Sequence, residues 1–238
     1  MLSLYNVIKV LYFALIFLIT TSCKINTVTD SVVKNAPPSV IKYLALGDSY
    51  TIGQSVRSSE SWPAQLADSL RQKGYIIDRL KIIAKTGWTT SDLQRGIREN
   101  NPDSSYNLVS LLIGVNNQHR GYNSVIYRQE FRELLQQSIA FTGGNESHVI
   151  VLSIPDYSVT PFGSELEPAT IRRQIDLFNA INLDETMKTD AHYFDITSLS
   201  REVANDISLL APDGLHPSAK MYQVWVNLIL PVIISTWD

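Results

Sequence analysis

A serine, an aspartate and a histidine stand in this sequence where they would suit an acyl-transfer reaction. Ser49 follows an apolar run at residues 41–46, and Asp213 and His216 lie three residues apart near the C-terminus. A serine hydroxyl is a weak nucleophile at neutral pH, and a histidine can take its proton and later return it to the leaving group. An aspartate that accepts the imidazole N–H holds the tautomer and offsets the imidazolium charge. These residues predict hydrolysis through an acyl-serine intermediate.

The same reaction needs fixed hydrogen-bond donors for the oxyanion of the tetrahedral intermediate. Three candidates are the backbone N–H groups of Ser49 and Gly87 and the side-chain amide of Asn116. The loss of one such donor typically costs about a hundredfold to a thousandfold in rate. Each candidate comes directly or shortly after an apolar run of strand length. We therefore expect an oxyanion hole built from three strand ends.

Short apolar runs and longer stretches of helical spacing alternate along the chain. The predicted strands are residues 41–46, 80–84, 108–113, 149–154 and 193–196. The predicted helices are residues 62–73, 90–99, 124–141, 168–188 and a last helix from Pro217. This alternation predicts a parallel sheet with crossover helices, hence a three-layer α/β/α domain with about five strands. Ligands of such sheets bind beyond the carboxyl ends of the strands, so the candidate residues should meet there.

Aromatic residues near the site have two possible roles, whereas those of the last helix have one. Tyr50 and Trp88 flank site positions and would either form a platform for an acyl group or a sugar, or pack against neighbouring helices. The last helix starts at a proline, which lacks the N–H that a first turn does not need. We expect its core face to carry Tyr222, Trp225, Leu228 and Ile229.

The order of these residues resembles the sequence blocks of the SGNH or GDSL hydrolases, the GDSL-like lipases, acylhydrolases and lysophospholipase-like esterases. The matching segments are Leu46-Gly47-Asp48-Ser49-Tyr50, Gly87, Gly114-x-Asn116 and Asp213-x-x-His216, which span most of the chain from about Tyr43 to Ser218. The resemblance implies a flavodoxin-like fold and no metal or organic cofactor. It also implies that the nucleophile is Ser49, that Gly87 and Asn116 complete the oxyanion hole, and that Asp213 and His216 finish the triad.

One position departs from the family pattern. The family often has Asp directly after the block III asparagine, whereas this chain has Asn117. The oxyanion amide stays in place, but the hydrogen bonds that the aspartate would make come into question. The better known α/β-hydrolase elbow, G-x-S-x-G, does not fit, because Thr51 stands two places after Ser49.

Each block also has an ordinary structural explanation when it is taken alone. Gly47-Asp48-Ser49 would suit a strand-to-helix turn, Gly87 a tight turn before a helix, and Asn116 a turn as well. Asp213-Gly214 is a common turn pair. These explanations lose force together, since each would have to imitate a different block in the right order.

The remaining histidines compete with His216 for the role of base. His148 and His192 precede predicted strands, so we expect them at the opposite edge of the sheet. His119 follows the third predicted strand and would either line the cleft or lie exposed in a loop. His216 is therefore the candidate base.

The first residues have the pattern of a bacterial lipoprotein signal. Lys9 precedes an apolar run at 10–19, and the small residues Thr21 and Ser22 come directly before Cys23. Ten helical residues cover about half of the roughly 30 Å hydrocarbon core, so a transmembrane anchor fits less well. We expect a signal peptide over 1–22, a tether over 23–40 and the hydrolase domain over 41–238, with lipidation at Cys23. A simple secretory peptide, or a membrane stub with an incidental cysteine, is the alternative.

Composition excludes several classes of function. The 238 residues carry 20 Lys and Arg against 23 Asp and Glu, a net charge of −3, and have no long basic run, which disfavours nucleic-acid binding. A single cysteine forms no intrachain disulfide, and four scattered histidines give no zinc-finger spacing. These observations argue against a polyanion partner and against a structural metal site.

Three functions remain open from the sequence. We expect an esterase acting on a lysophospholipid, a simple acyl ester or an acetylated carbohydrate, anchored in the periplasm or outer membrane, or secreted if not lipidated. The alternative is a noncatalytic lipoprotein that binds a glycan or lipid in the same cleft. A nucleotide binder that uses residues 47–53 as an anion loop is the least favoured, because the loop lacks Gly-Lys-Ser/Thr and G-x-G-x-x-G.

Overall fold

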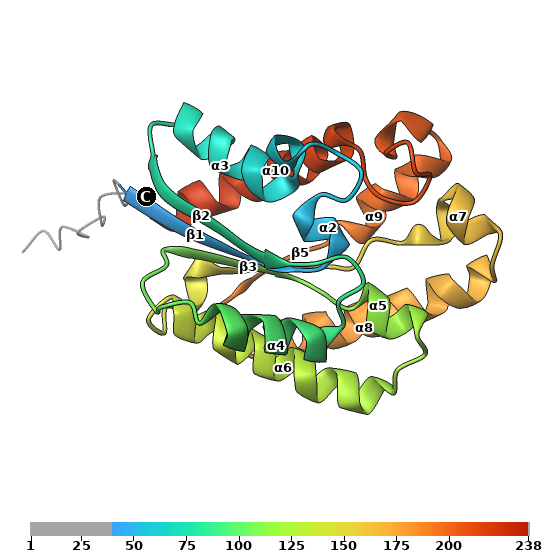
Figure 1. The fold of residues 1–238 in the computed structure, drawn as a ribbon, viewed down its shortest axis with the longest axis horizontal. Helices are drawn as coiled ribbons and strands as arrows, with labels where there is room; N and C mark the ends of the chain where they lie inside the picture. Colours follow the sequence, from blue (N-terminus) through green and yellow to red (C-terminus); the bar gives the residue numbers. More distant parts are fainter. Residues whose placement is uncertain (1–39, 238) are drawn as a thin grey trace, which may run out of the picture. The chain divides into compact units, whose positions relative to one another are not determined.

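The computed structural model describes residues 40–237, whose strands and helices are labelled in Figure 1. The predicted signal peptide and Cys23 lie outside the described residues. Of the predicted tether over 23–40, only Val40 is described. The strands are β1 (Val40–Gly47), β2 (Ile76–Ala84), β3 (Leu108–Leu112), β4 (Val149–Leu152) and β5 (His192–Phe194). The α-helices are α2 (Ser49–Ile52), α3 (Trp62–Gln72), α4 (Thr90–Asn100), α5 (Val115–His119), α6 (Ser124–Phe141), α7 (Pro161–Ser164), α8 (Pro168–Thr186), α9 (Thr197–Ser200) and α10 (Ala219–Trp237).

The five strands form one parallel sheet in the order β2-β1-β3-β4-β5, which confirms the predicted fold class. This is the strand order of flavodoxin-like folds, in which the direction of winding reverses between the first and third strands. The crevice beyond the carboxyl ends of β1 and β3 is therefore where a ligand is expected.

The burial of each strand follows from its place in the sheet. Every residue of β3 and β4 is buried, so these central strands read as continuous apolar runs. β2 lies at the edge, and it begins at Ile76 rather than at the predicted residue 80. Its first half contains Asp78 and Arg79, which an edge strand tolerates because those side chains reach water. Because Asp78 and Arg79 interrupt the apolar run, the sequence pattern placed the start of this strand too late.

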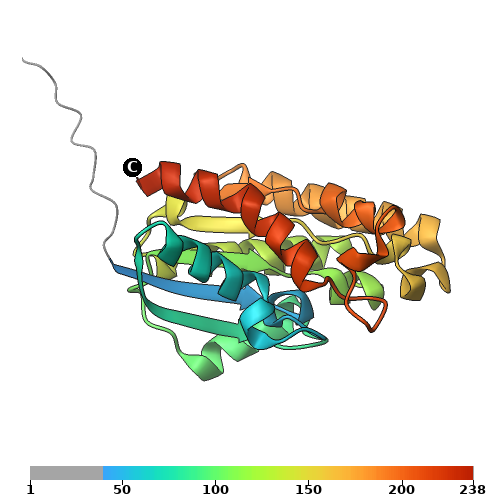
Figure 2. The ribbon, with the colours of Figure 1, turned by 90° about the horizontal axis from the view of Figure 1, so that it is seen from above.

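Helices cover both faces of the sheet (Figure 1). α3 and α10 lie side by side on one face, as Figures 1 and 2 both show. α4, α6 and α8 cover the other face (Figure 1). These two helical layers and the sheet give the predicted α/β/α arrangement. Apart from the differences named here, the predicted strands and long helices agree with the structure to within a few residues.

The last helix differs from the prediction in two details. It begins at Ala219, because Pro217 forms an antiparallel bridge with Leu210 and the Ser218 N–H donates to the Leu209 carbonyl. Leu228 is 41% exposed, so its placement on the core face was wrong. At about 100° per residue it lies about 120° around the helix from Tyr222. The expected core residues that are fully buried are Tyr222, Trp225 and Ile229.

Candidate active site

A pocket of about 190 Å³ opens beyond the carboxyl ends of β1 and β3. Four of the predicted site residues line it: Ser49, Gly87, Asn116 and His216. They come from the segments that directly follow β1, β2 and β3 and from the segment just before α10. The topology therefore brings together residues that are up to 167 positions apart, as the difference between 216 and 49 shows.

Ser49 is the first residue of the short helix α2, directly after β1. Asp48 caps this helix, because its Oδ1 accepts the Tyr50 N–H at 3.0 Å. The turn leaves no room for a side chain at Gly47, where a Cβ would lie 2.5 Å from the Leu112 carbonyl oxygen and collide with Thr51. The glycine thus lets β1 approach β3 closely while the chain turns into α2.

Asp213 and His216 form a hydrogen-bonded pair. Oδ2 of Asp213 lies 2.7 Å from Nδ1 of His216, and Oδ1 accepts the backbone N–H groups of Leu215 and His216, each at 3.0 Å. Burial acts to raise the pKa of Asp213. Hydrogen bonds from Ser55, from the backbone and ring of His216 and from Leu215 outweigh it and hold that pKa well below its ordinary value.

The ionised carboxylate determines which nitrogen of the histidine is the base. A carboxylate only accepts hydrogen bonds, so Nδ1 of His216 must carry the proton, and Nε2 of the neutral ring is then an acceptor. The His216 carbonyl accepts the Ala211 N–H at 2.8 Å, which fixes the backbone. The Tyr50 ring packs edge-on against the imidazole with centroids 5.7 Å apart. Nε2 is thus left available for a proton transfer.

No hydrogen bond joins the Ser49 hydroxyl to the His216 ring within residues 40–237, although both line the same pocket. Hydrogen bonds between a nucleophile and its base are commonly long before substrate binds and tighten in the complex. The arrangement is that of a nucleophile and base in one pocket, with the base oriented by a carboxylate.

The three predicted oxyanion donors all border the pocket. Within residues 40–237 the backbone N–H groups of Ser49 and Gly87 have no hydrogen-bond partner. Gly87 has φ +81°, and its carbonyl accepts a hydrogen bond of 2.7 Å from Arg120. Asn116 Nδ2 donates to the Trp88 carbonyl at 2.9 Å, which leaves its second amide proton unused. The site therefore has three donors to offer an oxyanion.

Aromatic residues that sequence reasoning missed form one wall of the pocket. Tyr157 and Phe162 line it together with His119, with pairwise ring centroids 6.2 to 6.3 Å apart. His119 Nδ1 lies 3.3 Å from the Tyr157 hydroxyl. Tyr157 follows β4. Because ligands of parallel sheets bind beyond the carboxyl ends of the strands, its position in the sequence was a usable signal.

The structure also shows where the other aromatic residues and histidines considered in the sequence lie. Tyr50 lines the pocket, whereas Trp88 packs over Gly96 of α4, where a Cβ would collide with its ring. His192 Nε2 lies 3.0 Å from the Thr236 hydroxyl, and the His148 ring packs against Trp237. His148 directly precedes β4 and His192 is the first residue of β5, so both lie at the edge of the sheet opposite the pocket, as predicted.

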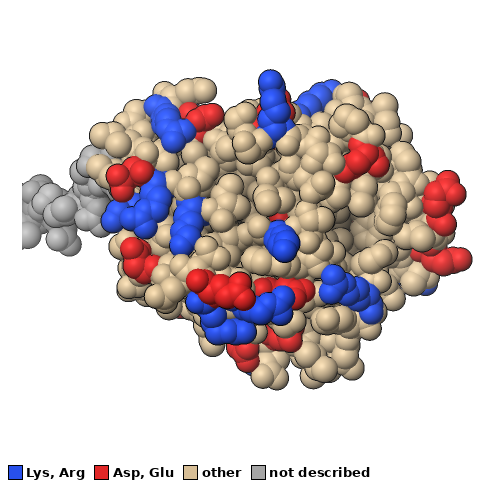
Figure 3. All heavy atoms as spheres, viewed as in Figure 1, with Lys and Arg blue, Asp and Glu red and all other residues tan. Residues whose placement is uncertain are grey.

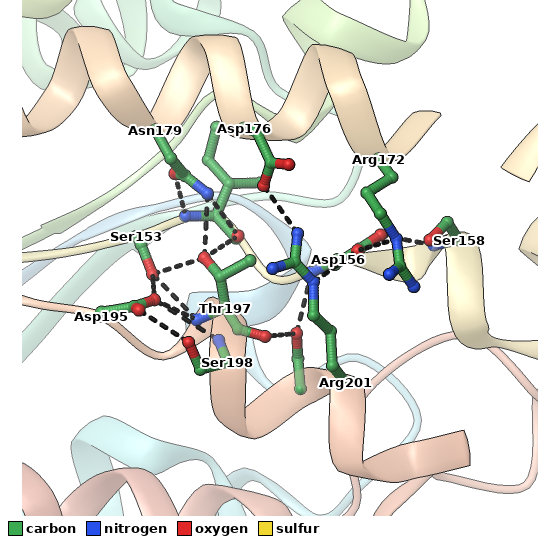
Figure 4. A network of polar contacts seen from close by, with 12 residues as sticks. Ser153, Asp156, Ser158, Arg172, Asp176, Asn179, Asp195, Thr197, Ser198 and Arg201 are labelled. Carbon is green, nitrogen blue, oxygen red and sulfur yellow. Dashed lines mark hydrogen bonds and ion pairs between the residues drawn. The ribbon is translucent and has the colours of Figure 1, made fainter. Parts of the chain in front are cut away.

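A network of polar contacts surrounds the Asp156 carboxylate, one residue before Tyr157 (Figure 4). The Asp156 carboxylate is fully buried and pairs with Arg201 Nε at 2.9 Å and with Arg172 Nε at 3.5 Å. Its other oxygen accepts the Ser158 N–H at 2.9 Å. The network thereby fixes the turn that carries Tyr157 into the pocket.

The pocket is uncharged apart from what its histidines contribute. No Lys, Arg, Asp or Glu of the described part lines it, so it offers no fixed cation to a phosphate or nucleotide. On the face shown in Figure 3, basic and acidic side chains are interspersed. Within residues 40–237 no three His, Cys, Asp or Glu residues gather as metal ligands. In the same range no helix has the length and apolar character needed to cross a membrane.

One family model and several solved structures match the chain. The GDSL-like Lipase/Acylhydrolase family matches residues 45–224. No curated protein matches the chain in sequence.

Several solved structures share the fold. The esterase EstA from Pseudoalteromonas sp. is 19% identical with a TM-score of 0.62, covering 82% of this chain and 97% of its own. A phospholipase A1 from Streptomyces albidoflavus NA297 is 21% identical with a TM-score of 0.60, covering 82% and 99%. The acetylxylan esterase Axe2 from Geobacillus stearothermophilus is 22% identical with a TM-score of 0.64, covering 84% and 96%. At these identities the likeness establishes the fold alone.

Proposed function

The chain belongs to the GDSL-like lipase/acylhydrolase family, and on this premise we propose that it is a serine esterase that hydrolyses carboxylic acyl esters. The observation that carries the proposal is the single pocket in which Ser49, the three candidate oxyanion donors and a carboxylate-oriented His216 meet. A protein that only binds a ligand has no need for this combination.

In the proposed acylation step, the Ser49 Oγ attacks the ester carbonyl carbon while Nε2 of His216 takes the hydroxyl proton. The carbonyl oxygen becomes an oxyanion, and the N–H groups of Ser49 and Gly87 and the Asn116 amide donate hydrogen bonds to it. Asp213 stabilises the imidazolium through Nδ1. When the C–O bond of the leaving group breaks, Nε2 returns its proton to the departing alcohol.

Deacylation in this proposal repeats the sequence with water as the nucleophile. His216 removes a proton from the water, the hydroxide attacks the acyl carbon, and the same donors bind the second oxyanion. Collapse of this intermediate releases the carboxylic acid and gives the proton back to Ser49 Oγ. Ester and water are thus converted to alcohol and carboxylic acid without a redox step or a further reactant.

The lining of the pocket supports a neutral, largely apolar acyl or alcohol group as its occupant. Tyr50, Val115, Tyr157, Phe162 and Leu215 supply apolar surface. Simple acyl esters, lysophospholipids and acetylated carbohydrates all present such a group beside the ester carbonyl. The names of similar folds, among them a phospholipase A1 and an acetylxylan esterase, fit the same range.

Hydrolysis of p-nitrophenyl acetate and of a longer-chain p-nitrophenyl ester tests the proposal. We expect the protein to turn over at least one ester, and Ser49→Ala and His216→Ala to lower kcat by several orders of magnitude. His148→Ala is the matched control, because this histidine lies at the other edge of the sheet. A folded protein that is inert on both esters but binds a glycan or a lipid would instead support the noncatalytic lipoprotein.

We also propose that Cys23 carries a lipid that anchors the protein in the bacterial cell envelope. The support is the sequence pattern of Lys9, the apolar run and the small residues before Cys23. Incorporation of labelled palmitate and partition into detergent should both be lost in Cys23→Ala. Equal partition of the variant and the parent protein would contradict the anchor.

A further inference from the structure

A serine outside the family blocks contacts the proposed triad. Ser55 lies in the turn between α2 and the short 3-10 helix η1 (Ser58–Glu60), and its hydroxyl donates to Asp213 Oδ2 at 2.5 Å. This is the same oxygen that faces Nδ1 of His216. The hydroxyl and the imidazole therefore share one carboxylate oxygen.

Ser55 is the one donor to Asp213 that comes from outside the carboxylate's own turn, among the described residues. The other three hydrogen bonds come from Leu215 and His216, which move together with Asp213. The Asp213 side chain is 31% exposed, so water can compete for its oxygens. A contact from a separate segment is what holds such a side chain relative to the rest of the pocket.

The backbone of Ser55 is unusual. Its φ is +68°, a left-handed conformation that non-glycine residues seldom adopt. The other described non-glycine residue with positive φ is Asn101, and it ends α4, where this conformation is ordinary. Ser55 ends no helix, because Gly53 is the C-cap of α2. A strained residue of this kind points to a functional contact.

The same turn also contacts the loop that carries an oxyanion donor. Gln54 Oε1 accepts a hydrogen bond of 2.6 Å from the Thr86 hydroxyl, and Thr86 lines the pocket beside Gly87. Two consecutive side chains thus connect the segment after Ser49 to the Gly87 loop and to the Asp213 turn. None of these contacts could be read from the family blocks.

We propose that Ser55 is a positioning residue that holds the Asp213 carboxylate, and through it the His216 imidazole, in line with Ser49. The inference rests on the proposed esterase function. It adds a residue that touches neither substrate nor reacting atoms and acts through Asp213. The left-handed backbone of the turn is what brings the short serine side chain within reach of Oδ2.

Two variants separate the hydroxyl from the backbone conformation. Ser55→Gly removes the hydroxyl and relieves the left-handed strain, whereas Ser55→Ala removes the hydroxyl and keeps the strain. We expect both variants to lower kcat by about tenfold to a hundredfold while KM stays within about twofold of the parent value. The Ser55→Gly variant should unfold at a higher temperature than the Ser55→Ala variant. Ser55→Thr keeps the hydroxyl and should retain most of the activity at a lower unfolding temperature. Ser59→Ala, an exposed serine of the same segment, is the control.

A spectroscopic measurement gives a readout that does not depend on turnover. The downfield proton resonance of His216 Nδ1–H, assigned by its loss in His216→Ala, should shift or broaden in Ser55→Gly. It should be unchanged in Ser59→Ala. This resonance reports directly on the bond between the imidazole and Asp213.

The possible failures are distinguishable. If the parent protein hydrolyses esters and Ser55→Gly has the same kcat and the same Nδ1–H resonance, the positioning role is wrong and the esterase function stands. If kcat instead follows the unfolding temperature, so that Ser55→Gly is more active than Ser55→Ala and Ser55→Thr is the least active, Ser55 has a purely structural role. If the parent protein hydrolyses no ester, the proposed function fails first.

Discussion

Asn117 binds both polar groups of Thr90. Its Oδ1 accepts the Thr90 backbone N–H at 3.0 Å, and its Nδ2 donates to the Thr90 hydroxyl at 2.7 Å, with both residues fully buried. The Thr90 hydroxyl in turn donates to Glu130 of α6. An amide can donate and accept, whereas a carboxylate can only accept. The asparagine that departs from the family pattern thus connects α5 to the start of α4.

Asn117→Asp is predicted to destabilise the protein. The new carboxylate would still accept the Thr90 N–H, but it would then compete with Glu130 for the one hydroxyl proton. We expect the free energy of unfolding to fall by about 1–2 kcal/mol, the cost of one buried polar group left unpaired. Denaturant unfolding at neutral pH measures it.

A second substitution checks this explanation. Glu130→Gln supplies a donor to the Thr90 oxygen and frees the hydroxyl proton for the new carboxylate. The double variant Asn117→Asp with Glu130→Gln should recover most of the lost stability, which a double-mutant cycle quantifies. Strictly additive effects of the two changes would contradict the shared hydroxyl.

Arg120 is predicted to support the oxyanion hole from outside the pocket. Its guanidinium holds the Gly87 carbonyl at 2.7 Å and lies 3.9 Å from Asp92. Arg120→Met keeps most of the apolar stem and loses the hydrogen bond, so kcat should fall about tenfold with KM little changed. Arg95→Met is the matched control, because Arg95 pairs with Asp92 at 2.6 Å. Equal effects of the two substitutions would rule out a role through Gly87.

Asp48 is predicted to make stability depend on pH. Burial raises its pKa from the ordinary 3.8 to about 7, and its Oδ2 has no partner among the described residues. Between about pH 4 and pH 7 the folded protein keeps a proton that the unfolded chain releases, so the free energy of unfolding falls as pH rises. The shift of about 3 pKa units corresponds to up to about 4 kcal/mol.

The comparison with Asp48→Asn isolates this effect. The variant lacks the titration, so its stability relative to the parent protein should increase between pH 4 and pH 8. Other titrating groups cancel in the difference. Parallel stability curves for the two proteins would show that Asp48 is ionised in the folded state.

Leu215 is predicted to limit the size of the acyl group. It lines the active-site pocket and also a second cavity of about 10 Å³, which shares Tyr50 and Tyr157 with the pocket. Leu215→Ala should join the two spaces and raise kcat/KM for a longer-chain ester relative to the acetate by about tenfold. Leu210→Ala is the control, since Leu210 lines only the second cavity. An unchanged ratio would contradict this account of specificity.

The parts of the fold that could be predicted are those with a strong repeating pattern. β3 and β4 are buried throughout, and α6 has the predicted bounds Ser124–Phe141, because long or fully buried elements have clear apolar periodicity. The short helices α2 and α5 escaped prediction, since five residues or fewer show no period. Yet Ser49 begins α2 and Asn116 lies in α5, so the site depends on elements too short to predict.

The supporting contacts of the site could not be predicted either. Ser49, Gly87 and Asn116 were identified because the family blocks and the strand-end rule coincide on them, whereas His216 was identified from its spacing to Asp213 and from the family block. The contact from Ser55 to Asp213 joins residues 158 positions apart. Such pairs follow from the folded geometry and leave no pattern in local sequence.

The most direct test of the central claim is covalent trapping of the nucleophile with a p-nitrophenyl alkylphosphonate. The proposed triad predicts one equivalent of p-nitrophenol released per protein and one phosphonyl adduct, located by mass spectrometry on Ser49. Ser49→Ala should take up no adduct, and His216→Ala should react far more slowly. An adduct on a different residue, or ester hydrolysis that continues with Ser49 unmodified, would contradict the claim that Ser49 is the nucleophile.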